Sequence, residues 1–290
     1  FISKGKTIRG SLVLLSSEAY GLNITRDVLL TASAMELIQA GLLIHDDIID
    51  QDRTRRGADT IFVQYEYLAD TLHIADKIPF GRGMAICVGD ATFFLAVELI
   101  SETHAAAAML HTLSQEYISV CVAQMQDITF GLSREMPTED EILTLYRYKT
   151  ARYTFSLPLT LGAILAGAPQ QEITQLELLG EQIGILFQLH DDMLNLFGNM
   201  NETGKPVSSD IREGKKTLAY LYLYNSASVD ERKKLNDLPN NISYVYELFE
   251  KYHVTAKVEQ KSQELRQKAY AILSTVHIKT DTLHELIEFI

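Results

Sequence analysis

The sequence has little proline, little cysteine and less basic than acidic charge. Six prolines occur in 290 residues, and they are widely spaced: Pro79, Pro137, Pro158, Pro169, Pro206 and Pro239. The stretches between them are rich in Leu, Ala, Glu and Gln, which are residues that favour helix. Scarce proline in this composition favours an all-α protein.

The shortage of basic residues bears on the choice of partner. The chain has 26 Lys and Arg against 38 Asp and Glu, a formal net charge of -12. A nucleic-acid partner is not expected, because phosphate binding needs a basic face. Ordinary acidic solubility accounts for most of this charge. Acidic residues can nevertheless recruit metal ions, and a few basic residues can still form a local anion site.

The two cysteines, Cys87 and Cys121, lie far apart and lack the spacing of metal ligands. We expect both to be buried apolar residues in a reducing, cytoplasmic setting. No apolar run reaches the ~18 residues that a membrane span needs, so we expect no transmembrane segment. No signal peptide is visible, and the start at Phe1 leaves open whether a further segment precedes it.

Three apolar stretches predict buried helices. Residues 27–50, 81–100 and 176–198 are apolar almost all round, as in the inner helices of a large bundle. The tail from about residue 243 onward is amphipathic and more polar, which predicts an outer layer. The length allows one large domain or two small ones.

Two short motifs predict where helices begin. Thr138 with Glu141, and Ser228 with Glu231, have the spacing of capping boxes. Pro158 follows the first of these helices, and we expect it to kink or end that helix.

Two of the apolar helices end in the same acidic pattern. "LIHDDIID" (residues 43–50) and "QLHDDMLN" (residues 188–195) both place His-Asp-Asp after an apolar run. Residues four apart share a helix face, so each pattern gathers its polar side chains. The two sets are Asp46, Asp47 and Asp50, and Asp191, Asp192 and Asn195. One such cluster could be a solvated helix end, but two favour a bound counterion.

Oxygen ligands of this kind suit Mg²⁺, which keeps waters and shares its shell with phosphates. His45 and His190 precede the two pairs, and we expect them to pack beside the ligands rather than bind metal. Arg55 and Arg56 could clamp a diphosphate by paired hydrogen bonds. More basic residues lie in polar loops that contain glycine: Lys6, Arg9, Lys205, Lys215 and Lys216. Together these groups predict a site for a diphosphate with an apolar tail, received by the apolar helices.

At these residues the chain resembles the all-trans polyprenyl diphosphate synthases. The match runs from "GKTIRG" to "DIREGKKTL", roughly three quarters of the chain, and includes both acidic clusters, "RRG", "YKT" and "FQLHDD" in that order. The resemblance implies an all-α bundle of about ten or more helices around a deep central cavity. It implies one synthase domain over residues 1–290, and a homodimer.

The resemblance also implies a role for each motif residue. Asp46, Asp47 and Asp50 would bind Mg²⁺ and the allylic diphosphate. Asp191 and Asp192, with Asn195, would complete a cluster of three Mg²⁺ ions once substrate is bound. The isopentenyl diphosphate contacts would be Lys6, Arg9, Gln39 and Arg56. The allylic diphosphate contacts would be Arg55, Lys149, Lys205 and Lys215. Thr150 and Gln188 would turn oxygens toward the developing carbocation.

The implied reaction suits these residue types. Magnesium and the cationic side chains draw diphosphate off the allylic substrate. The double bond of isopentenyl diphosphate attacks the resulting cation, and a proton then leaves with the departing diphosphate as its acceptor. The reaction needs no protein nucleophile, and the sequence offers no Ser/His/Asp arrangement that would indicate one.

Three positions depart from the family pattern. Gln39 stands where histidine is usual, and it can donate a hydrogen bond but carries no charge. Asn195 ends the second cluster in place of aspartate, so one charge is lost there. Gly10 replaces a frequent proline, a change that we expect to matter little.

Product length depends on bulk near the first cluster. Gly41 and Leu42, a turn before it, leave that place fairly open. Phe93 and Phe94, after Gly89 and Asp90, could form a floor lower down, which predicts a product near C20, with C15 also open. The alternatives are a longer-chain synthase, a terpene cyclase and a non-catalytic partner subunit.

Overall fold

The computed structural model describes residues 5–197, 214–235, 242–277 and 281–290, and these residues are helical almost throughout. The predicted all-α class is therefore confirmed. Contacts divide the chain into two compact units: Phe1–His111 with Leu161–Ala168, and Thr112–Thr160 with Pro169–Ile290. We refer to them as the first and second units. The expected single domain over residues 1–290 stays a prediction.

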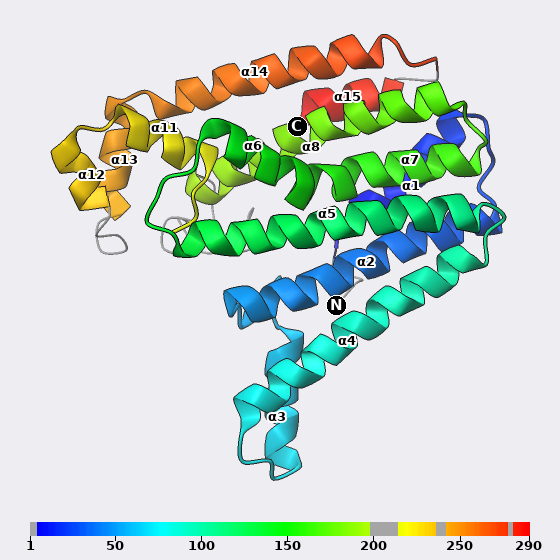
Figure 1. The fold of residues 1–290 in the computed structure, drawn as a ribbon, viewed down its shortest axis with the longest axis horizontal. Coiled ribbons are helices and arrows are strands. Elements are labelled where there is room, and N and C mark those ends of the chain that lie inside the picture. The colour runs from blue at the N-terminus through cyan, green and yellow to red at the C-terminus, as the bar shows by residue number, and fades with distance from the viewer. Residues whose placement is uncertain (1–4, 198–213, 236–241, 278–280) are drawn as a thin grey trace. The chain divides into compact units, whose positions relative to one another are not determined.

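The first unit is built on two long helices packed side by side, α2 (Arg26–Asp50) and α4 (Lys77–Ser101) (Figure 1). The helix α1 (Ile8–Ala19) packs on α2, and α3 (Ile61–Thr71) packs mainly on α4. Thr25 caps α2 by accepting a hydrogen bond from the Val28 backbone N–H, as an N-cap threonine should. These elements place the first acidic cluster at the C-terminal end of α2.

The second unit is built on α8 (Gln170–Phe197), which packs against the helix η2 (Arg147–Ser156) and against α14 (Val254–Leu273) (Figure 1). The other described helices of this unit are α6 (Glu139–Tyr146), α11 (Leu218–Ser226), α12 (Val229–Leu235), α13 (Ile242–Lys251) and α15 (Asp281–Phe289). Two helices are shared between the units, α5 (Ala106–Leu132) and α7 (Leu157–Leu165). The second acidic cluster lies at the C-terminal end of α8.

The segment η2 is a π-helix ten residues long, which is unusual because π-helices are mostly single turns. It continues directly into α7, so the expectation that the helix ends at Pro158 is wrong, and a kink there stays a prediction. Pro158 is the second residue of α7 and has no backbone N–H to donate to the turn before it. The proline therefore sits where the π-helix gives way to α-helix.

Small residues let η2 and α8 approach closely. A Cβ built on Gly180 would lie 2.5 Å from the backbone N of Ser156, and one on Gly184 would lie 2.3 Å from the Cα of Ala151. Ala151 and Ser156 are five residues apart, the hydrogen-bond period of a π-helix, so they share one face. The glycines of α8 are four apart, so they share a face as well.

Both predicted capping boxes are present. Thr138 Oγ1 accepts from the Glu141 backbone N–H, and the Glu141 carboxylate accepts from the Thr138 backbone N–H at 2.8 Å. At α12, the Glu231 carboxylate accepts from the Ser228 backbone N–H at 2.8 Å. These motifs fix the starts of α6 and α12, as their spacing predicts.

The expectation of buried cysteines is wrong. Cys87 on α4 and Cys121 on α5 are both free and exposed. The helices α2 and α4 are each long and apolar enough to cross a membrane by length and composition. A core helix of a soluble protein passes the same test, so the expected absence of a transmembrane segment stays a prediction.

We predict that Gly180→Ala destabilises the protein by roughly 1–3 kcal/mol, because overpacking at a tight contact costs about that much. The added methyl group would meet Ser156 backbone, which cannot rotate away. Gly131→Ala in α5 is the matched control, since a Cβ there meets no atom within 4 Å. Thermal unfolding checks both, and equal melting temperatures for the two variants would contradict the close packing.

We predict that Glu231→Gln lowers the melting temperature near pH 7, with a gap to the wild type that narrows below about pH 4.5. Hydrogen bonds from Lys251, Ser228 and Tyr252 lower the pKa of Glu231 below its ordinary value. The stability from the ionised form is therefore present above that ordinary value and lost as the pH falls. Glu247→Gln, at an exposed position of α13, is the control. A gap independent of pH would contradict the prediction.

Candidate functional site

Asp47 is the most buried residue of the first acidic cluster, with 1% of its surface exposed. Its Oδ1 accepts a hydrogen bond from Nε of Arg55 at 2.6 Å. Burial raises the pKa of Asp47 to about 6, although the Arg55 charge opposes the shift. The other carboxylate oxygen, Oδ2, is buried and has no hydrogen-bond partner among the described residues. An orphaned buried carboxylate oxygen calls for a further ligand.

The neighbouring carboxylates surround the same guanidinium. Nη2 of Arg55 lies 3.7 Å from Oδ2 of Asp46 and 3.7 Å from Oδ2 of Asp52. Asp46 is half-buried and Asp50 is exposed. Among the described residues, no three His, Cys, Asp or Glu side chains converge to hold a metal ion. The donor set still suits Mg²⁺, because Asp47 offers a free oxygen beside other carboxylates.

The chain turns back toward the end of α2 at Gln51, which has a left-handed φ of 59°, and Arg55 follows in a short two-stranded ribbon. The strands β1 (Thr54–Arg55) and β2 (Ala58–Asp59) pair antiparallel, so Arg56 and Gly57 form the loop between them. Both loop residues have positive φ, 51° and 71°, as tight hairpin loops of this kind need. Arg55 is therefore half-buried among the aspartates, whereas Arg56 is exposed at the tip.

Three of the four predicted isopentenyl diphosphate contacts, Lys6, Arg9 and Gln39, lie just before α1, on α1 and on α2, and Arg56 lies in the β1–β2 loop. Lys6 is exposed just before α1, and Arg9 is half-buried in its first turn. The Gly10 backbone N–H donates to Oε1 of Glu36 at 2.8 Å, which ties this turn to α2 one turn before Gln39. A proline at position 10 has no such donor. Gly10 therefore makes a contact with α2 that proline would lack, and the expectation that this departure matters little stays a prediction.

Aromatic rings fill the space over two glycines where α2 meets α4. A Cβ built on Gly41 would lie 2.4 Å from Cε1 of Phe93, and one on Gly89 would lie 2.3 Å from Nε2 of His45. The two rings stand edge to face, with centroids 5.3 Å apart. The expectation that Gly41 leaves an open place is wrong, because the Phe93 ring occupies that place. His45 packs against α4, with Nε2 3.2 Å from the Ile86 carbonyl oxygen.

The two candidate floor residues differ in their surroundings. Phe93 is half-buried over Gly41, and Leu42 is half-buried as well. Phe94 is 74% exposed. Adjacent helix residues leave the axis in different directions, so the structure separates Phe94 from Phe93. Their role in setting product length stays a prediction.

Asp192 is the buried member of the second cluster, and it is held by neutral donors. Its Oδ1 accepts from Nε2 of Gln188 at 2.7 Å, and its Oδ2 accepts from the Tyr146 hydroxyl. The Leu218 backbone N–H in turn donates to the Tyr146 oxygen at 3.0 Å. Asp191 is exposed, and Nδ2 of Asn195 lies 3.4 Å from its Oδ2. Asp191 therefore presents its carboxylate toward solvent, whereas Asp192 is tied into the unit.

The segment η2 carries two predicted catalytic residues toward two different helices. Lys149 forms an ion pair with Asp127 of α5. Thr150 Oγ1 donates to Oε1 of Gln188 on α8 at 2.7 Å. The Gln188 amide is thus fixed at both ends, by Thr150 and by Asp192. Fixed dipoles of this kind are how proteins stabilise developing charge.

Two of the three predicted lysines before α11, Lys215 and Lys216, are among the described residues. Lys215 is half-buried. Nζ of Lys216 donates to the carbonyl oxygens of Ser133 and Glu135, at 2.7 and 2.6 Å, and burial lowers its pKa. Lys205 lies outside the described residues.

The sequence interpretation missed Asp127, Tyr146 and Glu36. Each contacts a predicted site residue or its neighbour: Lys149, Asp192 and Gly10 respectively. The signal for Asp127 was available, since it is a lone acid in an otherwise apolar and polar-neutral stretch, "VAQMQDITF". Nothing local in the sequence distinguishes Tyr146 from the other 13 tyrosines among the 14 present.

Comparison with known proteins supports one family. The family model described as polyprenyl synthetase matches residues 1–250. The chain is 35% identical over 240 residues to a short chain isoprenyl diphosphate synthase of Methanocaldococcus jannaschii, covering 82% of this chain and 68% of that protein. It is 32% identical over 283 residues to a geranylgeranyl diphosphate synthase of Sulfolobus acidocaldarius, covering 88% and 80%.

A solved structure agrees with these relatives. The geranylgeranyl pyrophosphate synthase of Corynebacterium glutamicum, complexed with isoprenyl diphosphate and magnesium, superposes with a TM-score of 0.89 at 31% identity, over 99% of this chain and 86% of that one. A match over most of the length, in sequence and in fold, shows that the chain belongs to the polyprenyl synthetase family.

Proposed function

We propose that this chain is a trans-prenyltransferase that condenses isopentenyl diphosphate with an allylic prenyl diphosphate, head to tail, into an all-trans polyprenyl diphosphate. Family membership supports this reaction, and the names of the relatives favour a product of C15 or C20 over longer chains. The relatives include a (2E,6E)-farnesyl diphosphate synthase of Mycobacterium bovis, 35% identical over 217 residues.

The observation that carries the proposal is the environment of Asp47. A buried carboxylate with one paired and one orphaned oxygen, beside a guanidinium, is suited to hold a cation and an anion side by side. Asp46 and Asp50 add carboxylates on the same helix end. Magnesium, when bound there, neutralises diphosphate charge and so helps it to leave. We propose that three Mg²⁺ ions are bound when the substrate is present.

The cationic side chains of the chain orient the two diphosphates. Arg55 can present paired N–H groups to the allylic diphosphate, since its planar fork matches two oxygens. Lys149 and Lys215 add positive charge on the allylic side. Lys6, Arg9, Gln39 and Arg56 serve isopentenyl diphosphate, with Gln39 contributing a hydrogen bond in place of charge. Lys205 belongs to the proposal on sequence alone.

The Thr150 and Gln188 oxygens serve the developing carbocation. The fixed hydrogen bonds around them keep their dipoles from reorienting as charge develops, which lowers the cost of reaching the transition state. Asp191 and Asp192, with Asn195, complete the carboxylate and amide set. A terpene cyclase would not need anchors for a second diphosphate, and an inactive partner subunit would not need the intact first cluster.

We propose a homodimer in the cytoplasm. Four exposed apolar side chains on α5 support an interface there: Ile118, Val122, Met125 and Leu132. Their spacing of three, four and seven residues places them on one helix face. An apolar face of this kind commonly marks a protein contact.

The proposed reaction is tested with Mg²⁺, labelled isopentenyl diphosphate and allylic starters of three lengths, followed by sizing of the products. We predict that Asp47→Asn reduces turnover by about 100-fold or more, the order of loss for a group that stabilises charge at the reacting centre. Asp59→Asn, at an exposed position of β2, is the matched control and keeps activity. No elongation by the wild type with any starter would overturn the proposal.

The same Asp47→Asn variant should be more stable than the wild type in magnesium-free buffer near pH 8. Because burial raises the pKa of Asp47 to about 6, the wild type gains stability from the protonated form at low pH and loses it as the pH rises through that value. The gain should be on the order of 1–3 kcal/mol near pH 8 and vanish near pH 4. Thermal melts with a chelator present measure it.

We predict that Phe93→Ala lengthens the products, because removing the ring opens the place over Gly41. Phe94→Ala is the matched control on the same helix, and it should leave product length unchanged because Phe94 is exposed. Chromatography of the dephosphorylated products measures the chain lengths. Unchanged product lengths from Phe93→Ala would contradict the role of Phe93 in limiting the chain. Longer products from Phe94→Ala alone would show that Phe94, and not Phe93, limits it.

A further inference from the structure

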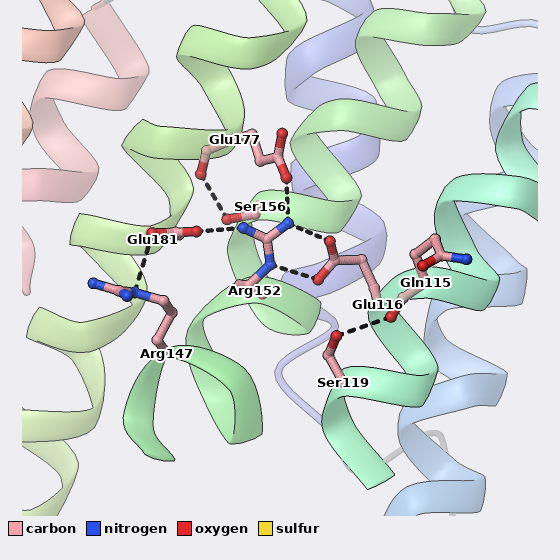
Figure 2. A network of polar contacts seen from close by, with 8 residues as sticks. All are labelled: Gln115, Glu116, Ser119, Arg147, Arg152, Ser156, Glu177 and Glu181. Atoms are coloured by element: carbon pink, nitrogen blue, oxygen red, sulfur yellow. Dashed lines mark hydrogen bonds and ion pairs between the residues drawn. The ribbon is translucent and has the colours of Figure 1, made fainter. Parts of the chain in front are cut away.

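Arg152 lies at the centre of a charged network inside the second unit (Figure 2). Its guanidinium forms ion pairs with Glu116 on α5 and with Glu177 and Glu181 on α8, including Nε to Oε2 of Glu116 at 2.8 Å. The Arg152 side chain is 15% exposed, and those of Glu116 and Glu181 are 8% and 11% exposed. Neither the resemblance nor the proposed reaction gives this network a role.

The charges of the network do not cancel. Three carboxylates surround Arg152, and Arg147 adds one more cation, with its Nε 3.2 Å from Oε2 of Glu181. Burial lowers the pKa of Arg152, but hydrogen bonds and the charge of Glu116 and Glu177 outweigh it and raise the pKa overall. A buried ion network is often no more stabilising than apolar packing of the same shape. We therefore look for its role in the positions of the helices that it connects.

That geometry concerns η2, where Arg152 lies. A π-helix of ten residues is rare and needs contacts from outside to persist. Arg152 reaches α5 and α8 together. The predicted catalytic residues of η2 reach the same two helices, since Lys149 pairs with Asp127 on α5 and Thr150 bonds Gln188 on α8. If η2 relaxed to α-helix, the directions of Lys149 and Thr150 would rotate relative to both helices.

The network also reinforces the tight seam between η2 and α8. The Ser156 hydroxyl donates to the Glu177 backbone carbonyl at 2.8 Å, and the Glu177 carboxylate pairs with Arg152 (Figure 2). One residue of α8 therefore contacts η2 through both its backbone and its side chain. Four residues on, Glu181 pairs with Arg152 and also with Arg147 at the start of η2. The ion pairs thus span most of the π-helical segment.

We propose that Arg152 is a positioning residue: its bridge from Glu116 to Glu177 and Glu181 holds η2 in its π-helical form and so aims Lys149 and Thr150 at the allylic diphosphate. This inference rests on the proposed function. It assigns Arg152 to the allylic side of the reaction, because both of the residues that it aims act there. Isopentenyl diphosphate binding, which uses residues of the first unit, should not depend on it.

The test uses a triple variant, Arg152→Met combined with Glu116→Gln and Glu181→Gln. We call it charge-balanced because the two charged residues left in the network, Arg147 and Glu177, have opposite signs. It neutralises the two buried carboxylates, whose loss of a partner would itself unfold the site, and leaves only Glu177, which is 36% exposed, without Arg152. Arg152→Lys keeps the charge but loses the planar fork. Glu231→Gln is the stability control, since it weakens the same unit far along the chain from η2. Circular dichroism and thermal melts establish that each variant is folded.

We predict that the charge-balanced variant loses about 10- to 100-fold in kcat/KM for the allylic substrate, the scale expected when reacting groups are misplaced by about 1 Å. Its KM for isopentenyl diphosphate should change less than about twofold. Arg152→Lys should fall between it and the wild type. Glu231→Gln should lower the melting temperature and leave both kinetic constants unchanged.

Binding separates positioning from a general structural effect. Calorimetry with an unreactive allylic thiolodiphosphate should show about tenfold weaker binding in the charge-balanced variant. In a Lys149→Ala/Thr150→Ala background the same three substitutions should add nothing, because Arg152 acts through those two residues.

Three outcomes would overturn the inference: unchanged allylic constants in a folded variant, equal losses for both substrates, or additive effects in the Lys149→Ala/Thr150→Ala background. A folded Arg152→Lys with unchanged allylic binding would do the same if the charge-balanced variant does not fold. Failure of the wild type to condense the substrates would instead overturn the proposed function.

Discussion

The hydrogen-bonded ion pair between Arg55 and Asp47 is the contact on which the first acidic cluster depends. Burial favours the neutral form of a carboxylate that is 1% exposed, and the charge and hydrogen bond of Arg55 oppose that effect. Arg55 comes from the strand that follows α2, so the chain must turn back within a few residues of Asp50. Gln51, with a left-handed φ of 59°, lies at that turn. The positive φ values of Arg56 and Gly57 belong to the next turn, between β1 and β2.

The second unit holds its buried carboxylates in two ways. Asp192 is surrounded by neutral donors, Tyr146 and Gln188, which satisfy its oxygens without cancelling its charge. Three glutamates are instead gathered around a guanidinium, that of Arg152. Asp47 differs from both, because one of its oxygens is paired with Arg55 and the other has no hydrogen-bond partner among the described residues.

Local features were predictable and long-range ones were not. The capping boxes at Thr138 and Ser228 involve residues three apart, so the sequence contains both partners side by side. Lys149 and Asp127 are 22 residues apart, and Arg152 and Glu116 are 36 apart. No periodicity joins such pairs, because they meet through tertiary packing. The π-helix was missed for the same reason: it packs closely against the glycines of α8, which lie more than 20 residues away in the sequence, and Pro158 alone indicated a break.

The space beside the glycines of α2 and α4 could not be predicted from the sequence of either helix alone. Gly41 lacks a side chain, which in isolation indicates empty space, but Phe93 fills that space from α4. The exchange is reciprocal, because His45 of α2 fills the space over Gly89. The sequence of one helix shows which large side chains it carries but not which helix they fill space on. In the packed pair, a ring from each helix covers a glycine of the other. The wall beside the first acidic cluster is therefore a joint property of α2 and α4, and substitutions at Gly41 and Phe93 should be coupled rather than additive.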